Sequence, residues 1–170
     1  ARALSMAGTQ TAVATDATAG FWNPASLTDI SHQYEISLMH AEYFAGIANY
    51  DYAGFATPVD SLSTLAVSAL RFAVDDIPDT RFLYDANGRI NYDNIRFFSA
   101  ADYAFLISYA RQIPRVKGLS LGANVKVIHR TVGSFANAWG FGLDAAATYR
   151  IQGWRVGLML HDITGTFNAW

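Results

Sequence analysis

The histidines are the first candidates for chemistry in this sequence of 170 residues. None of the four, His32, His40, His129 and His161, follows the His-x-x-x-His spacing that holds a zinc ion with a nearby glutamate. His161 precedes Asp162, but adjacent strand residues face opposite sides, so this pair is not expected to form one site. Without a cysteine, a Gly-x-Ser-x-Gly motif or a phosphate loop, we expect neither an enzyme nor a bound metal or cofactor.

One set of polar residues is predicted to meet on the small-residue face of three consecutive strands. A pairing that places Trp139 opposite Thr131 brings Lys126 opposite Asp144. The next hairpin brings His161 opposite the same aspartate. Since cross-strand neighbours have Cβ atoms about 4.5–5.5 Å apart, we expect one polar cluster inside the sheet. Its expected role is to balance charge and order water, with a transport role as the alternative.

Composition narrows the class of protein. Twelve basic against fourteen acidic residues give a net charge of −2, which excludes an overall basic nucleic-acid binder. Only 15% of the residues are charged and 52% are apolar, a balance that favours a membrane protein. Stretches free of charge reach only about a dozen residues, too short for a transmembrane helix. They are long enough for a transmembrane strand, which needs about 9–11 residues.

Alternation of apolar with small or polar residues is the main structural signal. Residues 101–111, 119–127, 139–151 and 154–160 alternate clearly, with Leu106 as an exception. Residues 32–44, 46–59 and 62–75 alternate less cleanly. Because successive side chains in a strand point to opposite faces, each segment has one apolar face. The sequence therefore predicts an all-β fold with seven antiparallel strands.

Two features favour a transmembrane β-barrel over a soluble barrel with its apolar face inward, which stays open as the alternative. The strands are predicted to have about 11–14 residues, whereas soluble strands cluster near 5–6. Aromatic residues lie near the segment ends, as in interfacial girdles. These residues are Tyr34, Tyr50, Tyr52, Tyr103, Tyr109, Trp139, Tyr149 and Trp154.

The connections predict an orientation. One long loop, from about Asp75 to Phe98, contains five Asp and three Arg together with Phe82, Leu83, Tyr84 and Tyr92. Such loops lie outside the cell in outer-membrane barrels, and the turn signal at 87–88 predicts a small hairpin within it. Bacterial barrels are closed and have even strand numbers. Seven strands therefore indicate about half of a longer barrel, or a barrel that a second chain completes.

The N-terminal segment has a different character. Residues 1–27 do not alternate, and their small side chains permit close packing against other backbone. Asn23, Pro24 and Ala25 stand out within it, with an ordinary N-terminal arm that makes a tight turn as the alternative interpretation. Pro24 keeps Asn23 extended and is well suited to start a short helix, which Asn23 would cap.

The order of several short stretches resembles a known family. The chain contains ARALSMAG at 1–8, TDA at 15–17, FWNPA at 21–25, AGFATP at 53–58, GANVK at 122–126, GFGLD at 140–144 and DITGTFNAW at 162–170. This set is similar to the FadL-like outer-membrane proteins, and most similar to the PorV/PorQ group associated with type IX secretion. The resemblance implies a transmembrane barrel of about 14 strands, with residues 1–30 as a hatch in its lumen and residues 31–170 as its first strands.

The same resemblance implies a location and partners. The protein would lie in the cell outer membrane, in contact with lipid and lipopolysaccharide. A PorV-like member would bind or shuttle secreted cargo together with other secretion-system proteins, and no nucleic acid is involved. The alternative is a FadL-like channel, in which a hatch gates the uptake of hydrophobic compounds. In that case Phe21, Trp22 and Leu27 would face an open cavity.

Overall fold

The computed structural model describes residues 2–84, 88–165 and 167–169, and its fold is all-β and antiparallel. The strands are β1 Glu35–Tyr43, β2 Ala48–Pro58, β3 Ser63–Asp79, β4 Arg96–Gln112, β5 Leu119–Val132, β6 Ala136–Ile151, β7 Trp154–Leu160 and β8 Phe167–Ala169. Short helices complete it: α1 Arg2–Ser5, α2 Ala19–Trp22, and the 3₁₀ helices η1 Pro24–Asp29 and η2 Tyr92–Asn94. Among these described residues, no helix has the length and apolar character to cross a membrane.

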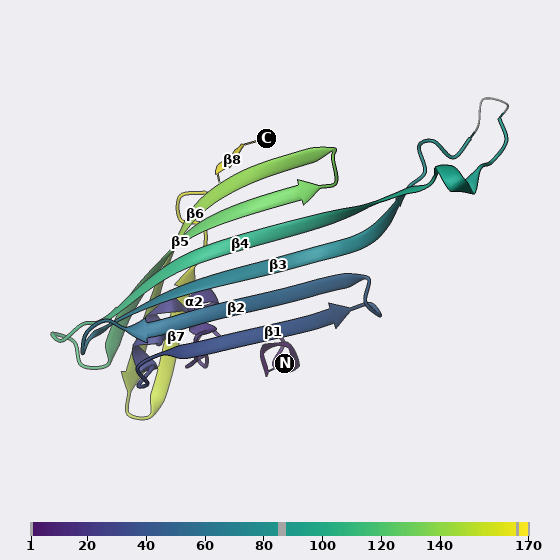
Figure 1. Ribbon diagram of the computed structural model, residues 1–170. Helices are drawn as coiled ribbons and strands as arrows, with labels where there is room; N and C mark the ends of the chain where they lie inside the picture. The colour runs from purple at the N-terminus through teal and green to yellow at the C-terminus, as the bar shows by residue number, and fades with distance from the viewer. Residues whose placement is uncertain (1, 85–87, 166, 170) are drawn as a thin grey trace.

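Strands β1 to β7 follow one another in a single curled sheet, a half-barrel (Figure 1). The prediction of an antiparallel sheet with seven consecutive strands is thus confirmed for the described part of the chain. The last strand has an interruption that the sequence did not indicate. β7 ends at Leu160 opposite Ala145, and the short β8 resumes pairing with β6 opposite Phe141, Gly140 and Trp139. The predicted turn at 87–88 and the stretch 162–170 lie partly outside the described residues.

The two faces of the sheet differ as the alternation predicts. The face that receives the N-terminal segment, here called the inner face, carries small and polar residues such as Ser68, Ser108, Asn124 and Thr148. The outer face exposes large apolar side chains along all seven strands. They include Ile36, Leu38, Phe55, Leu65, Val67, Phe105, Ile107, Leu121, Val125, Phe141, Leu143, Ile151, Val156, Leu158 and Leu160.

Three large residues, Tyr50, Tyr52 and Leu106, lie on the inner face, where most side chains are small. Tyr50 and Tyr52, predicted for an interfacial girdle, instead point inward, and Tyr52 is only 5% exposed. The Tyr52 hydroxyl donates to the carbonyl of Ala17, so a buried polar contact with the N-terminal segment decides its direction. Leu106, the exception to the alternation, is 4% exposed and packs against Tyr52. The interfacial prediction was therefore wrong for Tyr50 and Tyr52.

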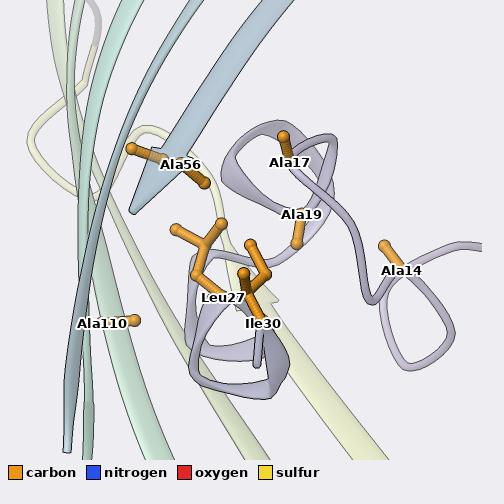
Figure 2. Close-up of a cluster of buried hydrophobic side chains, with 8 residues drawn as sticks. Ala14, Ala17, Ala19, Leu27, Ile30, Ala56 and Ala110 are labelled. Carbon is orange, nitrogen blue, oxygen red and sulfur yellow. The ribbon is translucent and has the colours of Figure 1, made fainter. Parts of the chain in front are cut away.

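The N-terminal segment covers the inner face (Figure 1). Its helices end at Asp29, and β1 begins at Glu35. Figure 2 shows Leu27 and Ile30 between the N-terminal coil, which carries Ala14, Ala17 and Ala19, and the strand residues Ala56 and Ala110. Leu27 is fully buried there, so the expectation that it faces an open cavity was wrong. Alanines on both sides bring the two backbones close together.

The loop predicted from about Asp75 to Phe98 is shorter than expected. β3 continues to Asp79 and β4 begins at Arg96, past a register shift between Val74 and Ile77. The charged residues of this region therefore lie partly on strands, which extend beyond their neighbours as an arm (Figure 1). A bridge between Tyr84 and Ile90 lies near the tip of the arm. The many charged residues of this region predict a loop from sequence. In the structure, β3 and β4 stay paired on both sides of the bulge, so the two strands continue past it.

Replacing Gly122 with alanine tests the packing of the N-terminal segment. The added Cβ would lie 2.3 Å from the backbone nitrogen of Ala25 and 2.6 Å from the carbonyl carbon of Pro24, so the segment must move. We expect Gly122→Ala to lower the free energy of unfolding by about 1–3 kcal/mol and to speed proteolysis of the N-terminal segment. Ala123→Val, on the exposed outer face of the same strand, is the control. Equal behaviour of the two variants would contradict this packing.

Candidate functional site

The Asn23-Pro24-Ala25 turn is buried against the inner face of the sheet. Asn23 caps η1, because its side-chain oxygen accepts a hydrogen bond from the backbone N–H of Ala25 at 3.1 Å. The side-chain amide of Asn23 donates to the carbonyl of Thr11 at 2.7 Å and to that of Ala147 in β6 at 3.4 Å. Proline follows at the first helical position, where its missing N–H has no cost. One side chain thus links two parts of the N-terminal segment to the wall.

Further hydrogen bonds join this segment to β5 and β6. Asn124 donates to the carbonyl of Gly20 at 2.9 Å. Thr28 donates to the Ser120 hydroxyl at 2.9 Å, and the hydroxyls of Ser26 and Thr148 lie 3.2 Å apart. These wall residues all belong to the small-residue faces of their strands. The inner face therefore serves as a polar docking surface for residues 20–28.

An ion-pair cluster holds the end of η1. Arg150 and Arg155 are direct partners across β6 and β7, where two like charges would repel each other. Asp29 lies between them: its carboxylate is 2.6 Å from Arg155 Nη2 and also contacts Arg150. Because the aspartate side chain is only 9% exposed, it has little access to water. The arginine pair and the N-terminal segment therefore stabilise each other.

The structure brings Lys126, Asp144 and His161 together at the interruption between β7 and β8. Lys126 Nζ is 3.0 Å from Asp144 Oδ1, with the two side chains 11% and 2% exposed. His161 Nδ1 is 3.8 Å from the same oxygen, and its side chain is 57% exposed. Asp162 completes the group, with Oδ1 2.8 Å from Lys126 Nζ. Its backbone N–H donates to Asp144 at 2.9 Å.

The predicted register between β5 and β6 was wrong by two residues, whereas the predicted pairing of Ile151 with Trp154 between β6 and β7 is confirmed. Lys126 pairs with Gly142, and Asn124 pairs with Asp144, because Val132 pairs with Ala136 across a tighter connection than expected. Lys126 reaches Asp144 diagonally instead. Gly142 leaves the necessary room: a Cβ there would lie 2.6 Å from Lys126 Cε and 2.8 Å from Asp162 Oδ1.

Asp162 is the member of the cluster that the sequence reasoning excluded. Its exclusion assumed that β7 continues through positions 161 and 162, so that His161 and Asp162 face opposite sides. The strand ends at Leu160, and Asp162 has a positive φ of 54° that turns it back toward β6. A left-handed backbone conformation is accessible to aspartate more than to most residues. The sequence did contain a signal for this contact, because His161 and Asp162 directly follow Leu160, where the alternating pattern ends.

A cavity of about 610 Å³ lies between the N-terminal segment and the edge of the sheet at β1 and β2. Phe21 and Trp22 line it from α2, as the channel alternative expects for these two residues. Tyr43, Tyr50 and Ser37 line it from the strands. The cavity thus combines aromatic side chains with polar ones, which include Gln10, Asp16 and Thr18.

The arm formed by β3 and β4 has a fixed base and an exposed tip. The Arg81 side chain donates to both carboxylate oxygens of Asp79, with Nε 2.9 Å from Oδ1 and Nη2 2.7 Å from Oδ2. The Arg81 guanidinium also lies 4.2 Å from the centre of the Phe135 ring in the β5–β6 connection. Beyond this base, large apolar side chains are exposed to solvent. They are Phe82, Tyr84, Ile90 and Tyr92.

Within residues 2–84, 88–165 and 167–169, no group of three or more histidine, aspartate or glutamate side chains has an arrangement suited to a metal ion. No family model matches the chain, and no curated protein matches it.

Truncation of Asp144 tests the buried cluster. Asp144→Ala leaves Lys126 with one carboxylate and removes the acceptor of the Asp162 N–H, so we expect a loss of about 3 kcal/mol in the free energy of unfolding. The matched control is Asp102→Ala, which breaks a cross-strand pair with Arg130 whose side chains are 37% and 56% exposed. That variant should lose less than about 1 kcal/mol. Equal losses in denaturant titrations of the two variants would refute a stabilising role for the cluster.

Proposed function

We propose that this half-barrel is part of a transmembrane barrel of the cell outer membrane, similar to the PorV/PorQ group, which serves type IX secretion. In this proposal the N-terminal segment is a hatch inside the barrel, and the seven strands are about half of the wall. The arm contacts secreted cargo or other secretion-system proteins. Outer-membrane lipid and lipopolysaccharide surround the wall.

The distribution of apolar side chains supports membrane embedding. A soluble barrel would turn its large apolar residues inward, whereas here the inner face is small and polar and the outer face exposes leucine, isoleucine, valine and phenylalanine. Exposed apolar patches of this extent are rare on soluble monomers. Trp139 and Trp154 lie at opposite ends of the apolar face of β6 and β7, as expected for an interfacial girdle.

The exposed tip of the arm is the observation that carries the secretion function. Its aromatic side chains, including Phe82, Tyr84 and Tyr92, are exposed, while Arg81 and Phe135 fix its base. Protein interfaces commonly combine aromatic anchors with a polar rim. A fixed base keeps these anchors available without a large ordering cost on binding. A solvated loop without a partner would have no need of this apolar surface.

The cavity beside Phe21 and Trp22 supports a second function, the uptake of a hydrophobic compound. An apolar solute that passes the hatch needs an apolar space along the wall, and this cavity extends from α2 to β1. Leu27 does not contribute, because it is buried in the core of the N-terminal segment. The two functions make different demands on the molecule and can be separated by substitution.

Introducing an arginine on the outer face tests membrane embedding. Leu143→Arg should lower stability in a bilayer by about 2–4 kcal/mol near the midplane, because the lipid cannot solvate the charge. Leu143→Met, at the same position, and Ala146→Ser, on the inner face, should be nearly neutral. Unfolding in lipid vesicles, followed by heat-modifiable gel mobility, measures the difference. A detergent-free soluble protein that tolerates Leu143→Arg would overturn this part of the proposal.

Removing the aromatic anchors of the arm tests the secretion function. We expect the double variant Phe82→Ser, Tyr92→Ser to reduce crosslinking to secreted cargo or secretion-system proteins about tenfold or more, because a few anchors dominate interface energy. The control is Tyr34→Ser, an exposed aromatic residue remote from the arm. Both variants should retain the wild-type stability of the barrel.

A substitution in the cavity distinguishes the second function. Ser37→Trp fills the cavity from β1 without touching the arm. If Ser37→Trp abolishes uptake of a labelled fatty acid and the arm variant secretes normally, the channel alternative replaces the secretion proposal. The reverse pattern supports secretion.

A further inference from the structure

The cavity beside α2 has an uneven distribution of charge. It measures about 610 Å³, and its walls come from the N-terminal segment and from strands β1 and β2. Among the described residues that line it, Asp16 is the one charged residue, and none is a lysine, an arginine or a histidine. This volume is within the range of small-molecule sites. The cavity therefore offers a ligand one negative charge and no positive charge from its described walls.

Asp16 belongs to a local turn that uses only one of its carboxylate oxygens. Oδ1 accepts a hydrogen bond from the backbone N–H of Thr18 at 2.9 Å and another from the Thr18 hydroxyl. In the described part of the chain, Oδ2 has no hydrogen bond or ion pair. The side chain is half-buried. Oδ2 can therefore accept a hydrogen bond from a ligand while the turn stays intact.

Aromatic rings from α2 and β2 lie close to this carboxylate. The Tyr52 hydroxyl donates to the carbonyl of Ala17 at 3.0 Å, which brings the preceding aspartate near the Tyr52 side chain. Phe21 and Tyr50 pack against the same tyrosine. The rings of Phe21 and Trp22 meet edge to face, with their centres 5.0 Å apart. Aromatic faces attract cations, most strongly where the cation is shielded from water.

These features discriminate between ligand head groups. An ammonium group can donate to Asp16 Oδ2 and lie against aromatic faces, and both interactions are stronger in a site with little water. A carboxylate would meet Asp16 as a like charge, with only neutral donors such as Gln10, Thr18 and Ser37 to offset the repulsion. An apolar chain of a given length gains equally from the cavity in both cases. The head group therefore decides the difference in affinity.

We infer that the cavity binds an amphiphilic amine, a compound with an ammonium group on an apolar chain or ring. The ammonium donates to Asp16, and the apolar part lies against Phe21, Trp22 and Met39. This inference rests on the second function proposed above, in which the cavity takes up a hydrophobic compound. It adds a preference for a cationic head group over an anionic one.

The test compares three probes of equal chain length, octylammonium, octanol and octanoate. Binding to the purified full chain in a nonionic detergent is measured by isothermal titration calorimetry at pH 7, with protein-free micelles as the blank. We expect octylammonium to bind about tenfold more tightly than octanoate, the effect of one charge-assisted hydrogen bond, with octanol between them. Octanoate that binds as tightly as octylammonium, or more tightly, would overturn the inference.

A variant of Asp16 tests the assigned carboxylate. Asp16→Asn keeps the acceptor for the Thr18 N–H but removes the charge, so it should lower the affinity for octylammonium about tenfold and leave octanol unchanged. The matched control is Asp60→Asn. Asp60 Oδ1 accepts from the N–H of Leu62 at 2.7 Å in the same kind of turn, and Asp60 does not line the cavity. If Asp16→Asn binds octylammonium as the wild type does, or if the two variants behave alike, the inference is wrong.

A variant that fills the cavity separates this inference from the second function. Ser37→Trp should abolish binding of all three probes, and heat-modifiable gel mobility shows that the variant is folded. If the wild type binds the three probes equally and Ser37→Trp binds none, the cavity is a ligand site but the head-group preference is wrong. If the wild type binds no probe, or if Ser37→Trp binds them unchanged, the second function fails and the inference fails with it.

Discussion

The close approach of the Asn23–Leu27 turn to strand β5 is the constraint on which the inner half of the structure depends. At Gly122 the two backbones are so close that a single methyl group would collide with Ala25. This distance requires small residues on both sides, and it permits the hydrogen bonds of Asn23 and Asn124 to reach backbone carbonyls on the opposite partner. Because these carbonyls are buried, their hydrogen bonds avoid a desolvation cost.

Once the inner face is occupied in this way, the large side chains have only the outer face available. A strand alternates by geometry, so a small inner face and a bulky outer face are two consequences of one pattern. Leu106 and Tyr52 are informative departures, since both fill the space beside the N-terminal segment that small residues would leave empty. The bilayer that we propose around the sheet would provide the apolar surroundings that the outer face lacks in water.

The interruption between β7 and β8 shows how a strand accommodates buried charge. Lys126 extends over Gly142 toward β7, and a continuous strand there would provide no carboxylate at that position. By leaving the sheet after Leu160, the chain brings the Asp162 carboxylate and backbone N–H to the pair. Both sheet edges, β1 and β7, have a single strand neighbour in the described part of the chain. In the bilayer that we propose, both edges would need further pairing.

The sequence by itself determined the strands and their two faces, because a period of two is a local property of extended backbone. It also indicated the Asn23-Pro24 turn, since a helix cap depends only on neighbouring residues. It placed Lys126 and Asp144 on the same face of the sheet, since alternation assigns each residue to a face locally. Only the tertiary structure decided that Lys126 lies opposite Gly142, that Asp162 joins the cluster and that Tyr52 points inward. These outcomes depend on the length of a connection, the end of a strand and a contact with Ala17, which join residues far apart in the chain. No local pattern encodes such distances, and a shift of two residues leaves every side chain on the same face.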